Sequence, residues 1–258
     1  MLLIYKYFEF SANVFLIAGG STPTRGRSNK DHLMTEAMNL DSKSNMAAMP
    51  SFGEIPSMRE STVGGLLGTT PIICGGFDDR EIDQDSCFTY NQQNTQWTKT
   101  HTMTTKRYSA GSVQLNATTL WIVGGGNEDD WTLASSEFVG VDSSIGKPGP
   151  LLPDPLAYSC VVKYSENEVF VIGGSQLRYL NVTNKVLIFN PMNGFTHFEG
   201  PSLITKRSSH SCGLMSNGQQ SKIVVAGGIS EHGRGALSSV EIYDSTTNNW
   251  ISGKDIIS

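Results

Sequence analysis

An all-β fold of repeated strand units is predicted from three observations. Five Gly-Gly pairs, each ending an apolar run, recur at intervals of 56, 49, 49 and 54 residues. Charged residues are only 17% of the chain and glycines number 27, a composition that suits strands and turns better than helices. Tyr90 and Trp97 are seven residues apart, as are Tyr243 and Trp250. The Gly pairs are Gly19-Gly20, Gly75-Gly76, Gly124-Gly125, Gly173-Gly174 and Gly227-Gly228.

Repeat five, at residues 207–257, shows most clearly the four strands expected in each repeat. Residues 207–215 and 240–244 alternate between apolar and polar side chains, as half-buried strands do. Residues 223–226 form an apolar run before the Gly pair, which predicts a strand buried on both faces. Residues 245–249 have turn chemistry, and Trp250 opens the fourth strand.

The other repeats follow this order with unequal clarity. Repeat two (59–100) begins strand one at Arg59, and repeat three (107–150) begins at Arg107. Repeat four (157–200) has Phe198 where the Trp stands elsewhere. Repeat one (1–50) is the weakest, and we interpret its apolar N-terminus as a first strand rather than a signal peptide, because Lys6 and Glu9 interrupt the run.

A four-stranded unit of this kind cannot bury both of its faces alone. Radial stacking of such units buries them, which is the principle of a β-propeller. We therefore predict one propeller over residues 1–257, with about five four-stranded blades, although a chain of 258 residues could also hold two smaller domains.

These residues resemble the kelch repeat, which combines a Gly-Gly pair after an apolar strand, a Tyr, a spaced Trp and often an Arg at strand one. The resemblance covers essentially the whole chain, and it implies a propeller whose loops form binding surfaces. Most kelch propellers have six or seven blades. Five repeats therefore indicate either a five-bladed ring or an incomplete ring with sequence missing, and we favour the second.

The resemblance implies a non-enzymatic module that binds a protein or a glycan through its loops. One alternative is a fragment of an intracellular kelch substrate adaptor of a ubiquitin ligase, or of an actin-associated protein. A less favoured alternative is a copper enzyme similar to galactose oxidase, since copper favours imidazole ligands. The five His residues do not pair at a metal-ligand spacing, so we expect them at surfaces or strand ends. We assign no catalytic residue, metal or cofactor. The histidines are His32, His101, His197, His210 and His232.

Charged residues give weaker indications of a partner. The net charge is −5 and there is no basic block, which argues against nucleic-acid binding, and no apolar stretch is long enough to span a membrane. The acidic runs 78–85 and 128–130 fall in loops between strands two and three, and they are either solvated or part of a face for a basic partner or Ca²⁺. Arg59, Arg107 and Arg207 either hydrogen-bond neighbouring blades or form a candidate binding face near the channel.

Cysteines and sequons favour an extracellular protein, with the cytoplasm as the alternative. Cys74 and Cys87 fall on adjacent antiparallel strands and resemble a Cys pair of secreted invertebrate kelch proteins, which makes them a candidate disulfide. Cys160 and Cys212 fall in strand one of consecutive repeats at apparently equivalent positions, and we expect free thiols there rather than a bridge. Two candidate glycosylation sites lie in predicted loops, at Asn116 and Asn181.

Overall fold

A computed structural model of the chain describes residues 6–11, 14–18, 35–39, 54–57, 59–177, 180–216, 221–230 and 236–256. The regular structure of these residues is β-strand apart from one short 3-10 helix, Pro191–Asn193. The prediction of an all-β fold is confirmed. The chain divides into two compact units, one of residues 1–109, 114–122 and 137–149, and the other of residues 110–113, 123–136 and 150–258.

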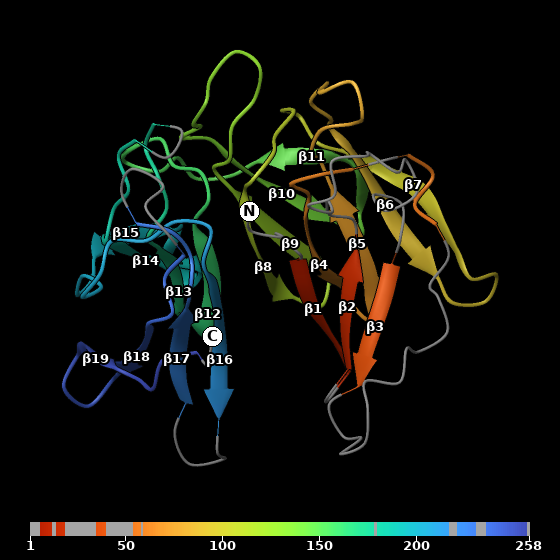
Figure 1. Cartoon of the computed structure of the whole chain (residues 1–258). Coiled ribbons are helices and arrows are strands. Elements are labelled where there is room, and N and C mark those ends of the chain that lie inside the picture. The colour runs from red at the N-terminus through yellow and green to blue at the C-terminus, as the bar shows by residue number, and fades with distance from the viewer. Residues whose placement is uncertain are drawn as a thin grey trace. The chain divides into compact units, whose positions relative to one another are not determined.

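The first unit contains the strands of repeats one and two and most of those of repeat three (Figure 1). Its first three strands form one antiparallel sheet, and the next eight form a second sheet in which β7 and β11 pair in parallel. Repeats two and three thus supply four strands each. The strands are β1 (Lys6–Ser11), β2 (Val14–Ala18), β3 (Thr35–Asn39), β4 (Val63–Leu67), β5 (Thr70–Cys74), β6 (Ser86–Asn91), β7 (Gln96–Thr102), β8 (Gly111–Asn116), β9 (Thr119–Val123), β10 (Ser136–Gly140) and β11 (Ser143–Pro148).

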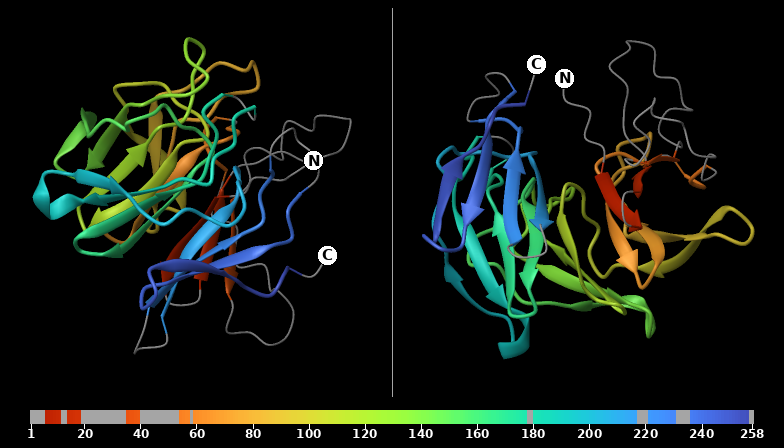
Figure 2. Two further views of the ribbon diagram at one scale, coloured as in Figure 1. Left: turned by 90° about the vertical axis from the view of Figure 1, so that its left-hand side faces the viewer. Right: turned by 90° about the horizontal axis from the view of Figure 1, so that it is seen from below.

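The second unit contains two four-stranded antiparallel sheets, one for repeat four and one for repeat five. Each sheet runs in chain order from its first to its fourth strand, and the blue sheet of repeat five is followed most easily in Figure 2. The strands are β12 (Cys160–Ser165), β13 (Glu168–Ile172), β14 (Val186–Asn190), β15 (Thr196–Glu199), β16 (Ser211–Ser216), β17 (Ser221–Ala226), β18 (Val240–Asp244) and β19 (Asn249–Ser252). Repeats two to five therefore have the predicted blade of four strands, whereas the Gly19-Gly20 pair of repeat one lies outside the described residues.

Aromatic pairs form part of the core in both units. Tyr243 and Trp250 face each other across β18 and β19 with ring centroids 5.5 Å apart, and Phe170 of the preceding blade lies 5.2 Å from Tyr243. Tyr90 and Trp97 make the equivalent pair in blade two at 5.4 Å. The large apolar area of these rings is thus buried in the core, as the fixed Tyr–Trp spacing predicts.

The second glycine of the pairs in repeats two to four connects one blade to the beginning of the next. The Gly76 N–H donates to the Arg107 carbonyl at 2.9 Å, and the Gly174 N–H donates to the Arg207 carbonyl at the same distance. Gly76 has a φ of +79°, and a Cβ there would collide with the carbonyl of Glu60. A residue with a side chain is therefore excluded by both backbone conformation and space, which explains the regular recurrence of the pair.

Two details of the predicted strands are wrong. Strand one begins at Val63, Gly111 and Ser211 rather than at Arg59, Arg107 and Arg207. The residues between adopt left-handed backbone that a strand cannot continue, with φ of 54° at Ser61, 51° at Ser109 and 53° at Ser209. The residue opposite Phe189 at the Trp position of blade four is His197, not Phe198. The 3-10 turn in this hairpin makes the loop one residue longer than in blade five.

Candidate functional site

Arg59, Arg107 and Arg207 occupy equivalent places just before strand one, and their side chains are buried. Their exposed fractions are 4%, 0% and 0%. A buried guanidinium cannot reach a partner, so the structure does not support a binding face formed by these residues. Each of these side chains bonds strand three, or the residue before it, in its own repeat.

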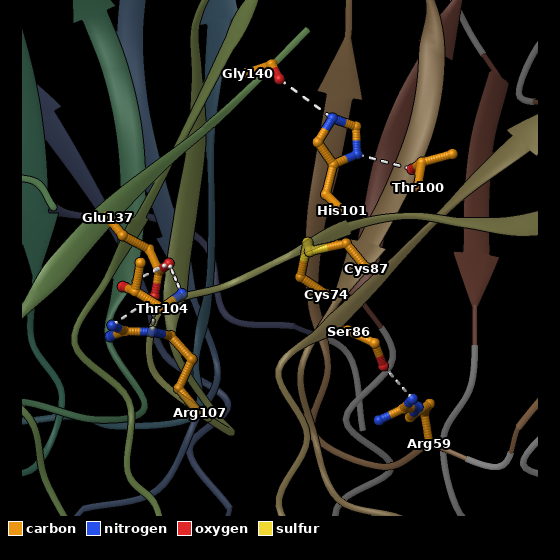
Figure 3. Close-up of a disulfide and its surroundings, with 10 residues drawn as sticks. All are labelled: Arg59, Cys74, Ser86, Cys87, Thr100, His101, Thr104, Arg107, Glu137 and Gly140. Atoms are coloured by element: carbon orange, nitrogen blue, oxygen red, sulfur yellow. Dashed lines mark hydrogen bonds and ion pairs between the residues drawn. A yellow bond between two sulfur atoms is a disulfide. The ribbon is translucent and has the colours of Figure 1, made fainter. Parts of the chain in front are cut away.

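In blades three and five the arginine forms a buried ion pair with a glutamate on strand three. The Arg107 Nη2 lies 2.8 Å from Glu137 Oε1 (Figure 3), and the Arg207 Nη2 lies 2.7 Å from Glu241 Oε1. The other Glu137 oxygen accepts the Thr104 N–H at 2.7 Å, which fixes the segment leading into the blade. Burial lowers the pKa of Arg107 from its ordinary value, and the charge of Glu137 offsets part of this effect.

Blade two replaces the glutamate with an aromatic ring. The Arg59 guanidinium lies 5.4 Å from the centroid of Phe88, the residue that corresponds in register to Glu137 and Glu241. It also donates to the Ser86 hydroxyl at 2.6 Å. A cation over an aromatic face is stabilised by the ring quadrupole. All three arginines thus act as scaffold residues.

Both cysteine pairs are joined by disulfides, and the described residues include no free cysteine. Cys74 and Cys87 are direct cross-strand partners on β5 and β6 with Cα atoms 4.0 Å apart (Figure 3). Cys160 and Cys212 join β12 to β16 with Cα atoms 5.9 Å apart. The expectation of free thiols at Cys160 and Cys212 is therefore wrong.

The second bridge forms because its two cysteines are not at equivalent positions. Cys160 pairs with Ile172, the residue before its Gly pair, whereas Ser211 holds that place in blade five and Cys212 comes one residue later. Successive side chains of a strand point to opposite faces. An offset of one residue therefore turns the two thiols towards each other across the gap between consecutive blades, whereas equivalent positions would point them the same way.

The loops that join strands two and three have bases of the same construction in four blades. We call them the 2–3 loops: residues 77–85, 126–135, 175–185 and 229–239. In each, a main-chain N–H near the end of the loop donates to the carbonyl of the second glycine of the pair. The donors and acceptors are Gln84 to Gly76 at 2.9 Å, Leu133 to Gly125 at 2.7 Å, Thr183 to Gly174 at 2.9 Å and Leu237 to Gly228 at 2.8 Å.

Above these bases the tips of the loops differ in chemistry. Asp78 organises the first tip, since one carboxylate oxygen accepts the N–H groups of Arg80 and Ile82. Asn127 organises the second in the same way, accepting the N–H groups of Asp129 and Asp130. Loops whose bases are fixed and whose tips vary are the usual location of recognition residues on a rigid scaffold.

Two of the 2–3 loops in the second unit are joined to each other. The Thr132 hydroxyl donates to the Gln176 carbonyl at 2.8 Å. The tip of residues 176–181 is closed by the Gln176 N–H, which donates to the Asn181 carbonyl at 3.0 Å. Sequence reasoning predicted the acidic run 128–130 in a loop but not this link, since a contact between loops 44 residues apart leaves no local signal.

The sequons both lie at exposed positions. Asn116 stands at the turn between β8 and β9, where its side-chain oxygen accepts from the N–H and the hydroxyl of Thr118 at 2.8 and 2.9 Å. Asn181 lies on a 2–3 loop, where its amide donates to the Gln176 side chain at 2.6 Å. Both acceptor residues are thus at the surface.

The structure describes three of the five histidines, and each has different surroundings. His101 lies at the end of β7 and contacts the Gly140 carbonyl at 3.2 Å (Figure 3), and burial lowers its pKa. His197 stacks against Phe189, and His210 is buried directly before β16, at a strand end rather than at the surface. His32 and His232 lie outside the described residues. In the part of the chain that the structure describes, no three His, Cys, Asp or Glu side chains are grouped as metal ligands, and no helix is long and apolar enough to cross a membrane.

The comparisons with known proteins agree with this architecture. The family described as "Kelch motif" matches residues 218–255, which lie in blade five. The solved structure titled "Structure of YjhT" is similar over 99% of this chain and 85% of that chain, with a TM-score of 0.79 and 11% sequence identity. A likeness at this identity shows the fold. No curated protein matches the chain. The class defined by the fold is thus the β-propeller, and residues 218–255 of blade five match the kelch motif.

Proposed function

We propose that this chain is a non-enzymatic binding module that recognises an extracellular protein or glycan partner with its 2–3 loops. One observation carries the proposal: four loops with the same hydrogen-bonded base carry tips of different composition. A scaffold role requires the bases to be alike. Recognition requires the tips to differ, because specificity depends on the side chains that each loop presents.

The extracellular part of the proposal is supported by the two disulfides. Such bonds persist in oxidising compartments and are rare in the cytosol. All four cysteines of the chain are paired in the structure, which suits a secreted protein better than a cytosolic adaptor.

Binding arrays with the purified chain test the proposal. We expect saturable binding to members of a peptide array or a glycan array. Replacing the tip residues 127–130 with a Gly-Ser segment should weaken that binding at least tenfold. The matched control replaces residues 191–194, because this turn joins strands three and four and so lies at the opposite end of the strands from the 2–3 loops.

Two results would overturn the proposal. The first is binding that survives changes in every 2–3 loop tip but is lost when turn 191–194 is altered. The second is stoichiometric copper in the native protein together with oxidation of an alcohol substrate, which would establish the rival redox enzyme.

A further inference from the structure

Large apolar side chains are exposed on the two linked 2–3 loops of the second unit. Trp131 is 50% exposed, Leu177 is 56% exposed and Leu180 is 65% exposed. We call these three residues the Trp131 patch. Exposed large apolar side chains gathered on neighbouring loops are uncommon on a surface without a binding role.

The link between the loops brings the members of the patch together. Trp131 and Leu177 each stand one residue away from the bond between the Thr132 hydroxyl and the Gln176 carbonyl. The Leu180 N–H donates a hydrogen bond to the Leu177 carbonyl. These hydrogen bonds restrain the chain at Thr132, Gln176 and Leu180 before any partner arrives, which lowers the entropy cost of binding.

Acidic residues border the patch on one side. Glu128, Asp129 and Asp130 immediately precede Trp131 and are exposed. Lys185, at the base of the other loop, makes a 3.5 Å ion pair with Asp154. Arg178 and Tyr179 stand between the two leucines and lie outside the described residues. The described rim is thus negative beside an apolar centre.

We propose that the Trp131 patch binds an extended peptide segment that carries both basic and large apolar residues. The apolar side chains of the segment would pack on Trp131 and the leucines, and its Lys or Arg residues would face the three carboxylates. Two leucines beside the tryptophan favour a peptide over a sugar, because leucine offers a sugar no hydrogen bond. This inference rests on the proposed function and specifies the partner of one pair of loops.

Tryptophan fluorescence gives a readout specific to the patch. The other three tryptophans of the chain are buried, with exposed fractions of 4% for Trp97, 0% for Trp121 and 6% for Trp250. Quenching by acrylamide should therefore report mainly on Trp131. We expect a synthetic nine-residue peptide of alternating Lys and Leu to protect Trp131 from acrylamide, with an affinity that falls as salt increases.

Three peptides and three protein variants complete the experiment. A Glu-Leu peptide and a Lys-Ser peptide should each bind at least tenfold more weakly than the Lys-Leu peptide. Trp131→Ala should also weaken binding of the Lys-Leu peptide at least tenfold. Binding to this variant is measured by the fluorescence polarisation of a labelled peptide. The double variant Asp129→Asn, Asp130→Asn should reduce the salt dependence. Phe198→Ala is the matched control, since Phe198 is 57% exposed on β15, and it should leave binding unchanged.

The outcomes separate this inference from the proposed function. Equal binding of all three peptides, or Lys-Leu binding that survives Trp131→Ala, overturns the patch while leaving the loops free to bind elsewhere. A glycan that protects Trp131 where the Lys-Leu peptide does not would make the patch a sugar site and overturn the peptide proposal. Failure of every peptide and glycan on the arrays overturns the proposed function itself. Protein made without glycosylation is used throughout, because a glycan on Asn181 would cover Leu180.

Discussion

Arg107 and Glu137 form an ion pair in which both side chains have an exposed fraction of 0% and the nearest nitrogen and oxygen lie 2.8 Å apart. Such a pair is costly to place in a protein interior, so every remaining donor and acceptor has to be satisfied. Glu137 accepts from the main chain of Thr104, and Glu241 accepts from Ile204 and Thr205, whereas the Arg207 Nε is buried without a hydrogen bond.

Blades without the glutamate also lack the main-chain N–H that donates to it in blades three and five. The position of Thr104 and Ile204, three residues before the arginine, is Pro56 in blade two and Pro153 in blade four. Proline has no N–H to bury. In blade four the ion pair itself is replaced by Leu156 and Leu187. The glutamate and the N–H donor are therefore present or absent together; blade four lacks the arginine as well, whereas blade two keeps Arg59 over an aromatic ring.

Removal of Glu137 tests this account. Glu137→Leu leaves the buried Arg107 guanidinium without its counter-ion and removes the acceptor of the Thr104 N–H, and should cost about 3–5 kcal/mol of unfolding free energy in urea titrations. The triple variant Thr104→Pro, Arg107→Leu, Glu137→Leu copies blade four and should recover at least half of this loss. A triple variant as unstable as the single one would contradict the conclusion that Thr104, Arg107 and Glu137 act together.

The parts of this architecture that a sequence can predict are those repeated at a fixed spacing. The Gly pairs and the Tyr–Trp pairs recur because blades repeat the same contacts, and they predicted four strands in each of blades two to five, although not where strand one begins. The partner of Cys160 could not be predicted, because it depends on a one-residue offset in strand one. His197 was missed for a similar reason, since a 3-10 turn shifted the register.

The candidate site was only partly predictable. The acidic run 128–130 identified one loop correctly, since charged residues between strands favour loops. The neighbouring Trp131 and Leu177 gave no periodic signal, and their relation depends on a contact between distant loops. The arginines were offered as a candidate binding face because a charged residue at a regular position suggests a surface role. Arg107 is instead buried against a glutamate 30 residues later in the chain.

Loss of the bridge between blades four and five should weaken the second unit. The Cys160–Cys212 disulfide closes a loop of 52 residues, and its removal by Cys160→Ser with Cys212→Ser should cost about 2–4 kcal/mol in urea unfolding. The exchange Cys160→Val with Val161→Cys moves the thiol to the other face of β12. Non-reducing peptide mapping should then find Cys212 unpaired. A restored bridge in this variant would refute the offset argument.

Asn116 should carry an N-glycan when the chain is secreted from eukaryotic cells. Its side chain is exposed at a tight turn, and the Thr118 hydroxyl already contacts it at 2.9 Å. Intact mass should fall by one glycan in Asn116→Gln and by the same amount in Thr118→Ala, which removes the sequon while keeping the asparagine. An unmodified Asn116 in chain recovered from the medium would count against the extracellular proposal.

His210 should make the stability of the protein depend on pH. Burial first, and the charge of Arg207 second, lower its pKa from 6.5 to about 3, and neither ring nitrogen makes a hydrogen bond of good geometry. The unfolded chain then binds a proton that the folded chain does not. Stability from this group is fully present above pH 6.5 and is lost as pH falls from there towards 3, at up to about 1.4 kcal/mol per pH unit.

Urea unfolding at several pH values measures this slope, and His210→Ala is the matched variant because Ala110 holds the corresponding place in blade three. In the variant, the fall in unfolding free energy that His210 causes between pH 6 and 4 should be absent. The pH dependence that comes from the carboxylates should remain. Parallel pH profiles for the two proteins would show that His210 takes up its proton in the folded state, with its ring exposed to water. That result would contradict the burial that Gly173 and Gly228 impose, since a Cβ at either glycine would come within 2.8 Å of His210.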